Sequence, residues 1–180
     1  MVESYTNYWR WENAVSPTMC DILLEDRKVL QEVEGCVGDN EILLPSKRIT
    51  KICWAPQNHW IESVMYNYAL YANESAGWGF QVGRPEQVQL GAYDINSFYS
   101  WHEDWAPLNK TPVLRKISVV LLLSNPEEFE GGQFEFGDAP VEMKRGTLIA
   151  FPSFLRHQVT PVTKGIRYSA TCWVNGPRTL

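Results

Sequence analysis

Apolar residues recur at the three- and four-residue steps of a helix in two segments of the first 80 residues. A first helix is predicted to begin at Ser16-Pro17, because serine caps a helix N-terminus and proline suits the first helical position. A second helix is predicted over about residues 58–75, and Gly77 ends its pattern. Short strands are predicted over residues 8–11 and 48–54. The apolar positions of the two helices are Met19, Leu23 and Leu30 in the first and Ile61, Val64, Met65, Tyr68, Tyr71 and Ala72 in the second.

From about residue 82 the pattern changes to short runs rich in Val, Ile, Phe, Tyr and Thr, separated by Gly, Pro and Asn. Such runs are typical of strands. The residues from Ile117 to Leu123 are apolar on both faces, as in a strand covered on both sides. The predicted strands are 87–93, 98–104, 116–124, 132–136, 147–151, 157–163 and 166–174.

This order of elements predicts an α+β, mainly β fold. We expect a double-stranded β-helix (jelly roll) core over residues 81–180, backed by N-terminal helices in residues 1–80. A chain of 180 residues is expected to form one domain, and it is long enough to bury a core without a disulfide or a structural metal.

Composition and charge exclude several classes of protein. A net charge of −5 argues against a protein that neutralises many phosphates, so no nucleic-acid partner is expected. No apolar run approaches the roughly 20 residues of a membrane span, so no membrane partner is expected either. The start of the chain lacks the pattern of a secretory signal. The four cysteines, Cys20, Cys36, Cys53 and Cys172, form no tight cluster, so a reduced, cytoplasmic protein is expected.

The candidate chemistry involves two of the three histidines. His102-Glu103-Asp104 lies in a predicted strand, where residues two apart share a face. On its own this tripeptide is more typical of a polar, exposed strand end. His157 begins a later predicted strand, and two imidazoles with one carboxylate form the facial triad of non-haem Fe(II). The remaining histidine, His59, stands at a predicted helix start, where a surface or capping role is expected.

The last two predicted strands place an arginine near this triad. If they form a hairpin centred on Lys164, His157 faces Thr171, and Arg167 and Trp173 share that face. Arg167 would then lie about 13 Å along the strand from Thr171. A buried guanidinium needs an anionic partner. A five-carbon diacid that chelates a metal at its other end would meet that need, and an ordinary salt bridge at the barrel mouth is the alternative.

Taken together, these residues resemble the core of the 2-oxoglutarate- and Fe(II)-dependent dioxygenases. More narrowly, the chain is similar to the prolyl 4-hydroxylase-like group, which includes the bacterial PKHD-type hydroxylases. The resemblance covers about residues 87–175. It rests on Tyr93, Tyr99, His102-Glu103-Asp104, His157 and Arg167, with further similarity in the segments 122–132 and 151–167.

The resemblance implies a role for eight residues. His102, Asp104 and His157 match the iron ligands of the family. Arg167 and Tyr93 match the residues that bind the distal carboxylate of 2-oxoglutarate. More loosely, three positions match the pocket for a peptidyl proline, namely Tyr99, Arg115 and Trp173. Leu122 stands nearest to a position where some oxygen-sensing hydroxylases have a cosubstrate tyrosine, so that contact is expected to be missing.

The implied activity is an oxygenase that uses Fe(II), 2-oxoglutarate and O₂, with ascorbate as a candidate addition, and hydroxylates a prolyl residue of a protein or peptide. Two alternatives stay open: the same chemistry on a free amino acid or other small molecule, and a non-catalytic jelly-roll module that binds a structural metal. Arg167 and Tyr93 argue against the module, because a structural metal needs no anchor for a diacid. The substrate's identity, the position hydroxylated and the oligomeric state do not follow from the sequence.

Overall fold

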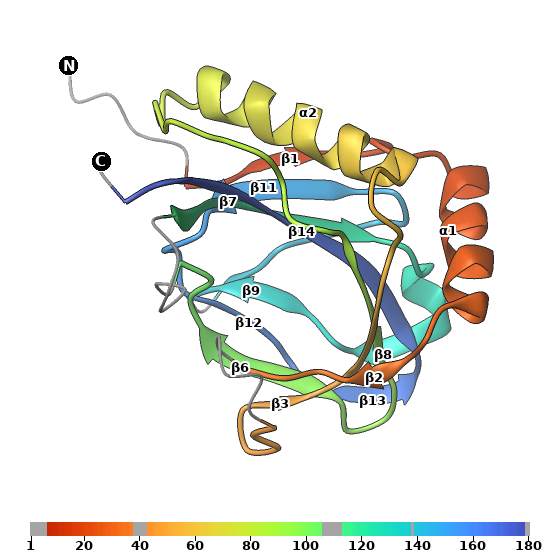
Figure 1. Ribbon diagram of the computed structural model, residues 1–180. Coiled ribbons are helices and arrows are strands. Elements are labelled where there is room, and N and C mark those ends of the chain that lie inside the picture. The colour runs from red at the N-terminus through yellow and green to blue at the C-terminus, as the bar shows by residue number, and fades with distance from the viewer. Residues whose placement is uncertain (1–6, 38–42, 106–112, 138, 179–180) are drawn as a thin grey trace.

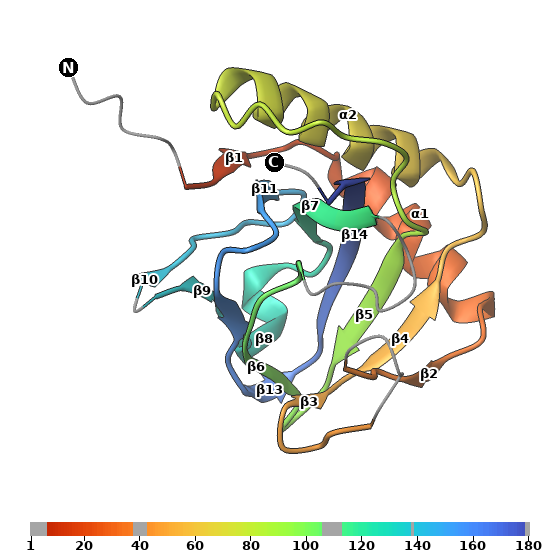
Figure 2. The ribbon, with the colours of Figure 1, turned by 60° about the vertical axis from the view of Figure 1, so that its left-hand side comes forward.

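The computed structural model describes residues 7–37, 43–105, 113–137 and 139–178. Two antiparallel sheets form the walls of a barrel-like core, and two helices lie outside one of them (Figures 1 and 2). The elements are β1 (Trp9–Trp11), α1 (Pro17–Val29), β2 (Val33–Glu34), β3 (Arg48–Ile49), β4 (Lys51–Trp54), α2 (Trp60–Ser75), β5 (Gln89–Tyr93), β6 (Phe98–His102), β7 (Val113–Leu122), a 3₁₀ turn (Pro126–Glu128), β8 (Phe129–Gly131), β9 (Phe134–Phe136), β10 (Ala139–Pro140), β11 (Leu148–Pro152), β12 (His157–Val159), β13 (Val162–Gly165) and β14 (Arg167–Pro177).

The larger sheet has the order β1-β11-β7-β14-β5-β4-β2, and the smaller has the order β10-β9-β12-β6-β3. One apolar core lies between the larger sheet and the helices and includes Leu23, Met65 and Leu121. A second, more aromatic core lies on the inner side and includes Phe134 and Phe151. This mainly β architecture, backed by the helices, confirms the predicted fold class.

The helices begin close to where the sequence predicts. The Ser16 hydroxyl accepts a hydrogen bond from the Met19 N–H at 3.3 Å, which caps α1. His59 caps α2, since its Nδ1 accepts from the Ile61 N–H at 3.5 Å. The buried face of α2, which includes Met65, lies along the larger sheet (Figure 1). Neither helix in the described part of the chain is long and apolar enough to cross a bilayer.

The N-terminal part of the chain also supplies strands to both sheets. β1 pairs with β11 at one edge of the larger sheet, and β4 pairs with β5 near the other. The predicted strand over residues 48–54 is divided at Thr50, whose hydroxyl donates to the Ala92 carbonyl at 2.9 Å. β3 on one side of Thr50 joins the smaller sheet, whereas β4 joins the larger. The first 80 residues are therefore more than helical support.

The predicted hairpin of the last two strands is wrong. β12 pairs with β6 and β9 in the smaller sheet, whereas β14 pairs with β5 and β7 in the larger. The chain leaves β12 at Pro161, which has no N–H to donate to a ladder, and it crosses over through β13. Thr171 therefore lies opposite Gln89 and Val120, not opposite His157. His157 and Arg167 come from opposite walls of the core.

The turn before β11 gives a test of local packing. Gly146 has φ +78°, and a Cβ there would overlap the carbonyl oxygen of Val15. Gly77 has a similar φ of +68°, with nothing within 4 Å of an added Cβ. We expect Gly77→Ala to lower the free energy of unfolding by about 1–2 kcal/mol, through backbone strain alone. Gly146→Ala should cost about 1–3 kcal/mol more, because of the overlap. Urea denaturation measures both, and equal losses would show that no overlap exists.

Candidate active site

The structure brings together His102, Asp104 and His157. His102 ends β6 and His157 begins β12, and the two residues are partners in the β-ladder, so their rings lie 4.1 Å apart. Asp104 follows the strand and is not part of it, because its N–H donates to the Ser153 carbonyl at 2.8 Å. Its carboxylate lies 3.6 Å from His102 Nε2 and 3.5 Å from His157 Nε2. One potential ligand atom from each of the three lies within 4.8 Å of the others.

Backbone carbonyls set the tautomer of both histidines. His102 Nδ1–H donates to the Ser100 carbonyl at 2.7 Å, and His157 Nδ1–H donates to the Leu155 carbonyl at 2.9 Å. A carbonyl only accepts, so the proton of each neutral ring lies on Nδ1 and the Nε2 lone pair is left for a metal. Burial, together with the nearby His157, lowers the pKa of His102 to about 3, which keeps this ring neutral.

Asp104 stays ionised within the protein. Burial favours its protonated form, but the neighbouring His157 and His102 outweigh this effect and lower its pKa. Its Oδ2 accepts a hydrogen bond from the Ser118 hydroxyl at 2.7 Å, and Ser118 in turn contacts the Ser153 hydroxyl at 2.9 Å. Two neutral imidazole nitrogens and one carboxylate oxygen are the donor set of a facial triad, so the three residues fit Fe(II).

Arg167 lines the same cavity from the opposite sheet. Its side chain is 2% exposed, and burial lowers its pKa. Its Nη1 donates to the Ser169 hydroxyl at 3.1 Å, and the guanidinium lies 5.4 Å from the ring centre of Tyr93, its partner across the β14–β5 ladder. Among the described residues no carboxylate lies within salt-bridge distance of it. The salt bridge considered as an alternative is therefore not seen there, and Arg167 is a buried cation that faces a cavity.

Leu122 lies near Arg167, outside the cavity that holds the triad. It lines a second cavity, which Arg167 and Gly132 also reach. The side chain is apolar, so this position offers no hydroxyl to a ligand of Arg167.

The three residues expected around the substrate are arranged differently from one another. Tyr99 and Trp173 line the cavity, and the Tyr99 ring stacks on His102 at 3.4 Å. Arg115 does not line it. Its guanidinium lies 3.8 Å from the ring centre of Trp173 and forms two hydrogen bonds with Glu86, at 2.8 and 2.6 Å. Arg115 therefore packs against Trp173 outside the cavity. It is half-buried and paired with Glu86, so it is neither a pocket-lining residue nor a free surface charge.

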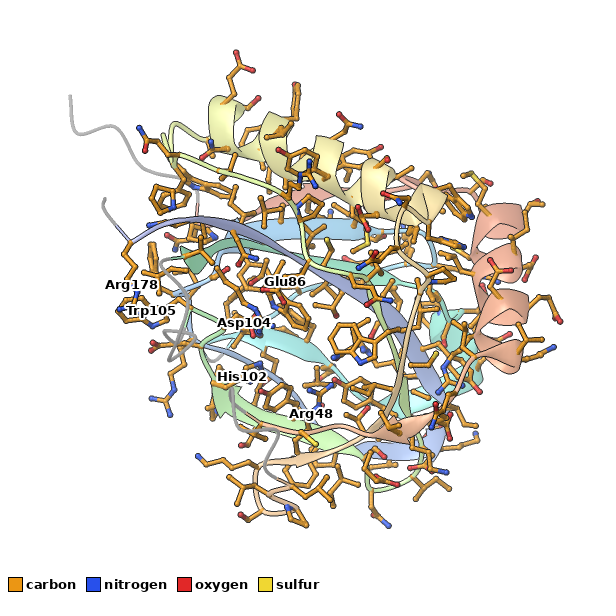
Figure 3. All side chains as sticks on the ribbon, viewed as in Figure 1. Arg48, Glu86, His102, Asp104, Trp105 and Arg178 are labelled. Carbon is orange, nitrogen blue, oxygen red and sulfur yellow. The ribbon has the colours of Figure 1, made fainter. Side chains whose placement is uncertain are left out.

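The sequence does not single out several residues of the cavity wall, and two of them have large polar side chains. Arg48 of β3 and Gln89 of β5 line the cavity that holds the triad, and both are buried. Figure 3 labels Arg48 and His102 in the lower part of the view, with Asp104 and Glu86 above them. Arg48 lies outside the segment that carries the family resemblance. In a strand this short, no pattern in the sequence distinguishes an arginine that lines a cavity from an arginine that is exposed to solvent.

Residues 88–175 match the family model of the 2OG-Fe(II) oxygenase superfamily. This core belongs to that superfamily. A PKHD-type hydroxylase from Synechococcus sp. (strain JA-2-3B'a(2-13)) is 36% identical over an alignment of 105 residues, and the match covers 53% of this chain and 47% of the relative. One from Teredinibacter turnerae is 34% identical over an alignment of 100 residues, and the match covers 50% of this chain and 44% of the relative. The chain spans about half the length of the curated relatives it matches.

Solved structures agree on the fold of this oxygenase core and of the part before it. The viral collagen prolyl hydroxylase of Paramecium bursaria Chlorella virus-1 superposes with a TM-score of 0.74 at 21% identity, over 95% of this chain and 97% of that one. A prolyl-4-hydroxylase from Pseudomonas putida gives a TM-score of 0.71 at 20% identity, over 94% and 92% of the chains. At this level of identity the likeness concerns the fold.

Proposed function

We propose that this chain is a 2-oxoglutarate- and Fe(II)-dependent oxygenase that hydroxylates a prolyl residue of a protein or peptide. The observation that carries the proposal is the buried Arg167, which lines the same cavity as the triad and has no carboxylate partner among the described residues. A metal at the triad needs no such cation. A dicarboxylate with one end at the metal and the other at Arg167 accounts for both groups.

The chain's own residues bind and orient the reactants. His102 and His157 would each offer Nε2 to Fe(II), and Asp104 would add a charged oxygen ligand. Arg167 would hold the distal carboxylate of 2-oxoglutarate, beside Tyr93 and Ser169. When bound, Fe(II), 2-oxoglutarate and O₂ supply an oxidant strong enough for an unactivated C–H bond. Apolar side chains on the cavity wall, Val120, Phe134 and Val159, help to exclude water from it.

The prolyl substrate is supported by two lines of argument. Tyr99 and Trp173 line the cavity with aromatic side chains, which suit an apolar pyrrolidine ring. Several structures with the same fold are those of prolyl hydroxylases, and one, from Trichoplax adhaerens, is in complex with a peptide fragment, with a TM-score of 0.65 at 16% identity. The same cavity could instead take a free amino acid, so both classes of substrate belong in the test.

The test is incubation of the protein with Fe(II), 2-oxoglutarate and O₂. A peptide library and free proline are offered as separate substrates. We expect succinate to form and a proline-containing peptide to gain the mass of one oxygen atom. Addition of ascorbate shows whether it sustains turnover. Oxidation of free proline as efficient as that of the best peptide would favour the small-molecule alternative. Metal binding without succinate formation would favour the non-catalytic module.

Trp173→Ala should separate substrate oxidation from cosubstrate consumption. We expect coupled hydroxylation of the peptide to fall by about ten-fold or more, because the ring that packs against the substrate is lost. Decarboxylation of 2-oxoglutarate without hydroxylation should persist, because the triad and Arg167 remain. Arg115→Ala should act in the same direction more weakly, through the position of Trp173. Paired assays of succinate and hydroxylated peptide measure both.

Trp54→Ala is the matched control, since this tryptophan is 38% exposed on β4 and does not line the cavity. An equal effect of Trp173→Ala and Trp54→Ala on coupling would contradict the role of Trp173.

A further inference from the structure

The cavity contains a second buried arginine that the proposed chemistry does not use. Arg48 is 8% exposed. Its Nη2 donates to the Gln89 side-chain oxygen at 2.7 Å, and its Nη1 donates to the Cys36 carbonyl at 3.1 Å. Both partners are neutral. The buried Nε–H has no hydrogen-bond partner, and no carboxylate of the described residues lies within 4.0 Å of the guanidinium.

The position of Arg48 is close to the metal ligands. Arg48 and Tyr99 are partners across the β3–β6 ladder, and the guanidinium lies 4.8 Å from the centre of the Tyr99 ring. The same ring stacks on His102 at 3.4 Å. The chain makes room for the guanidinium at Gly35, where a Cβ would lie 2.7 Å from Arg48 Nε. A group bound at Arg48 would therefore lie next to Tyr99, whose ring contacts His102.

The charges that line the cavity do not balance without another anion. Of the described residues that line it, Arg48 and Arg167 carry a guanidinium group and Asp104 alone carries a carboxylate. In the proposed function, the charges of Fe(II) and of the 2-oxoglutarate dianion cancel each other. One positive charge then remains. Arg167 takes the distal carboxylate of 2-oxoglutarate from β14, so the charge without a partner is that of Arg48 on the other sheet.

We propose that Arg48 binds a carboxylate of the primary substrate, next to the residue that is oxidised. This inference rests on the proposed function and adds a requirement on its substrate class. A buried guanidinium whose hydrogen-bond partners are all neutral pairs preferentially with a carboxylate. That carboxylate comes either from an acidic side chain beside the prolyl residue or from the α-carboxylate of a terminal or free proline. Gln89, held by Arg48, also lines this part of the cavity.

A purely structural Arg48 would have different consequences. Its contacts with Cys36, Gln89 and Tyr99 join a loop to two strands, so its loss is expected to lower stability in either case. A structural role gives no reason for the protein to distinguish a carboxylate from its amide. The ratio of the affinities for the carboxylate ligand and for its amide therefore distinguishes a ligand-binding Arg48 from a purely structural one.

The experiment compares pairs of ligands that differ only in one carboxylate. One pair of proline-containing peptides has Glu or Gln beside the proline, and another ends in proline as the free acid or the amide. Free proline and prolinamide form a third pair. Binding is measured by calorimetry under nitrogen, with Fe(II) and 2-oxoglutarate present, and again with the metal-free protein. Hydroxylation in air is measured separately.

We expect the unmodified protein to bind the acid of at least one pair more tightly than the amide, by about ten-fold to a hundred-fold. Arg48→Gln should remove most of this preference by weakening the binding of the acid. Arg48→Lys should keep part of it, because the charge remains and the planar fork is lost. Arg84→Gln, which removes the same charge at an exposed position, should leave the preference unchanged. The pair that shows the preference identifies the source of the carboxylate.

Equal binding of acid and amide in all three pairs by the unmodified protein would overturn the proposal, whether or not any variant folds. An undiminished preference in folded Arg48→Gln would also overturn it. Binding does not require turnover, so this result is separate from the proposed function. Succinate formation without a preference for the acid would refute the role of Arg48 alone. A preference without succinate formation would support Arg48 and refute the oxygenase.

Discussion

Replacement of His102, Asp104 or His157 by alanine is expected to abolish 2-oxoglutarate turnover and to weaken Fe(II) binding by more than about 100-fold. Loss of a residue that only orients a metal ligand typically costs 10- to 100-fold, so the loss of a ligand costs more. Each of the three offers one donor atom, and these atoms lie within 4.8 Å of one another. Iron content after dialysis and the rate of succinate formation measure the two effects.

His59→Ala is the matched control, because this histidine caps α2 and contacts Asp26, away from the cavity. It should retain iron and turnover, apart from a modest loss of stability. Thermal unfolding of each metal-free variant shows whether the fold is kept. If a folded variant at any of the three positions retains unmodified iron content and succinate formation, that residue is not a metal ligand.

The second large effect is expected at the other end of the cavity. Arg167→Ala should raise the apparent KM for 2-oxoglutarate by about ten-fold to a hundred-fold, because a charge-assisted contact of roughly 1.5–3 kcal/mol is lost. Iron binding should persist, since Arg167 lies on β14 and the triad is held by the other sheet and its adjoining loop. Titration of 2-oxoglutarate at fixed Fe(II) measures the change.

Arg115→Ala provides the comparison for this prediction. Arg115 is also partly buried and cationic, but it pairs with Glu86 and does not line the cavity. Its loss should leave the KM for 2-oxoglutarate within about two-fold of the original. An unchanged KM in Arg167→Ala would remove Arg167 from the cosubstrate site.

Much of the fold could be predicted because its signals are local. Ser16-Pro17 marks the start of α1 through hydrogen bonds within one turn, and the apolar run in β7 reflects burial on both faces. The two site histidines could be singled out because the chain has only three. The family resemblance predicts that Arg167 and Tyr93 belong to the same site, and both line the cavity in the structure.

Features that depend on contacts between distant segments could not be predicted in this way. The hairpin prediction assumed that neighbouring strands pair with each other, whereas the chain crosses between sheets after β12. His157 and Arg167 face the same cavity, although not for the reason of strand parity. Arg48 reaches the site only because β3 pairs with β6, which lies about 50 residues further along the chain. No periodicity in the sequence reports such a pairing.

The placement of His157 and Arg167 on opposite sheets has a consequence for motion. A ligand held at both ends would link β12 of one sheet to β14 of the other, so separation of the sheets would require the ligand to let go of one end. Any ligand that binds only the closed arrangement stabilises it by mass action. Backbone amides of both strands should therefore exchange their hydrogens for deuterium more slowly when metal and diacid are bound together than with either alone. Separation of the two sheets and release of the product succinate would then occur in the same step.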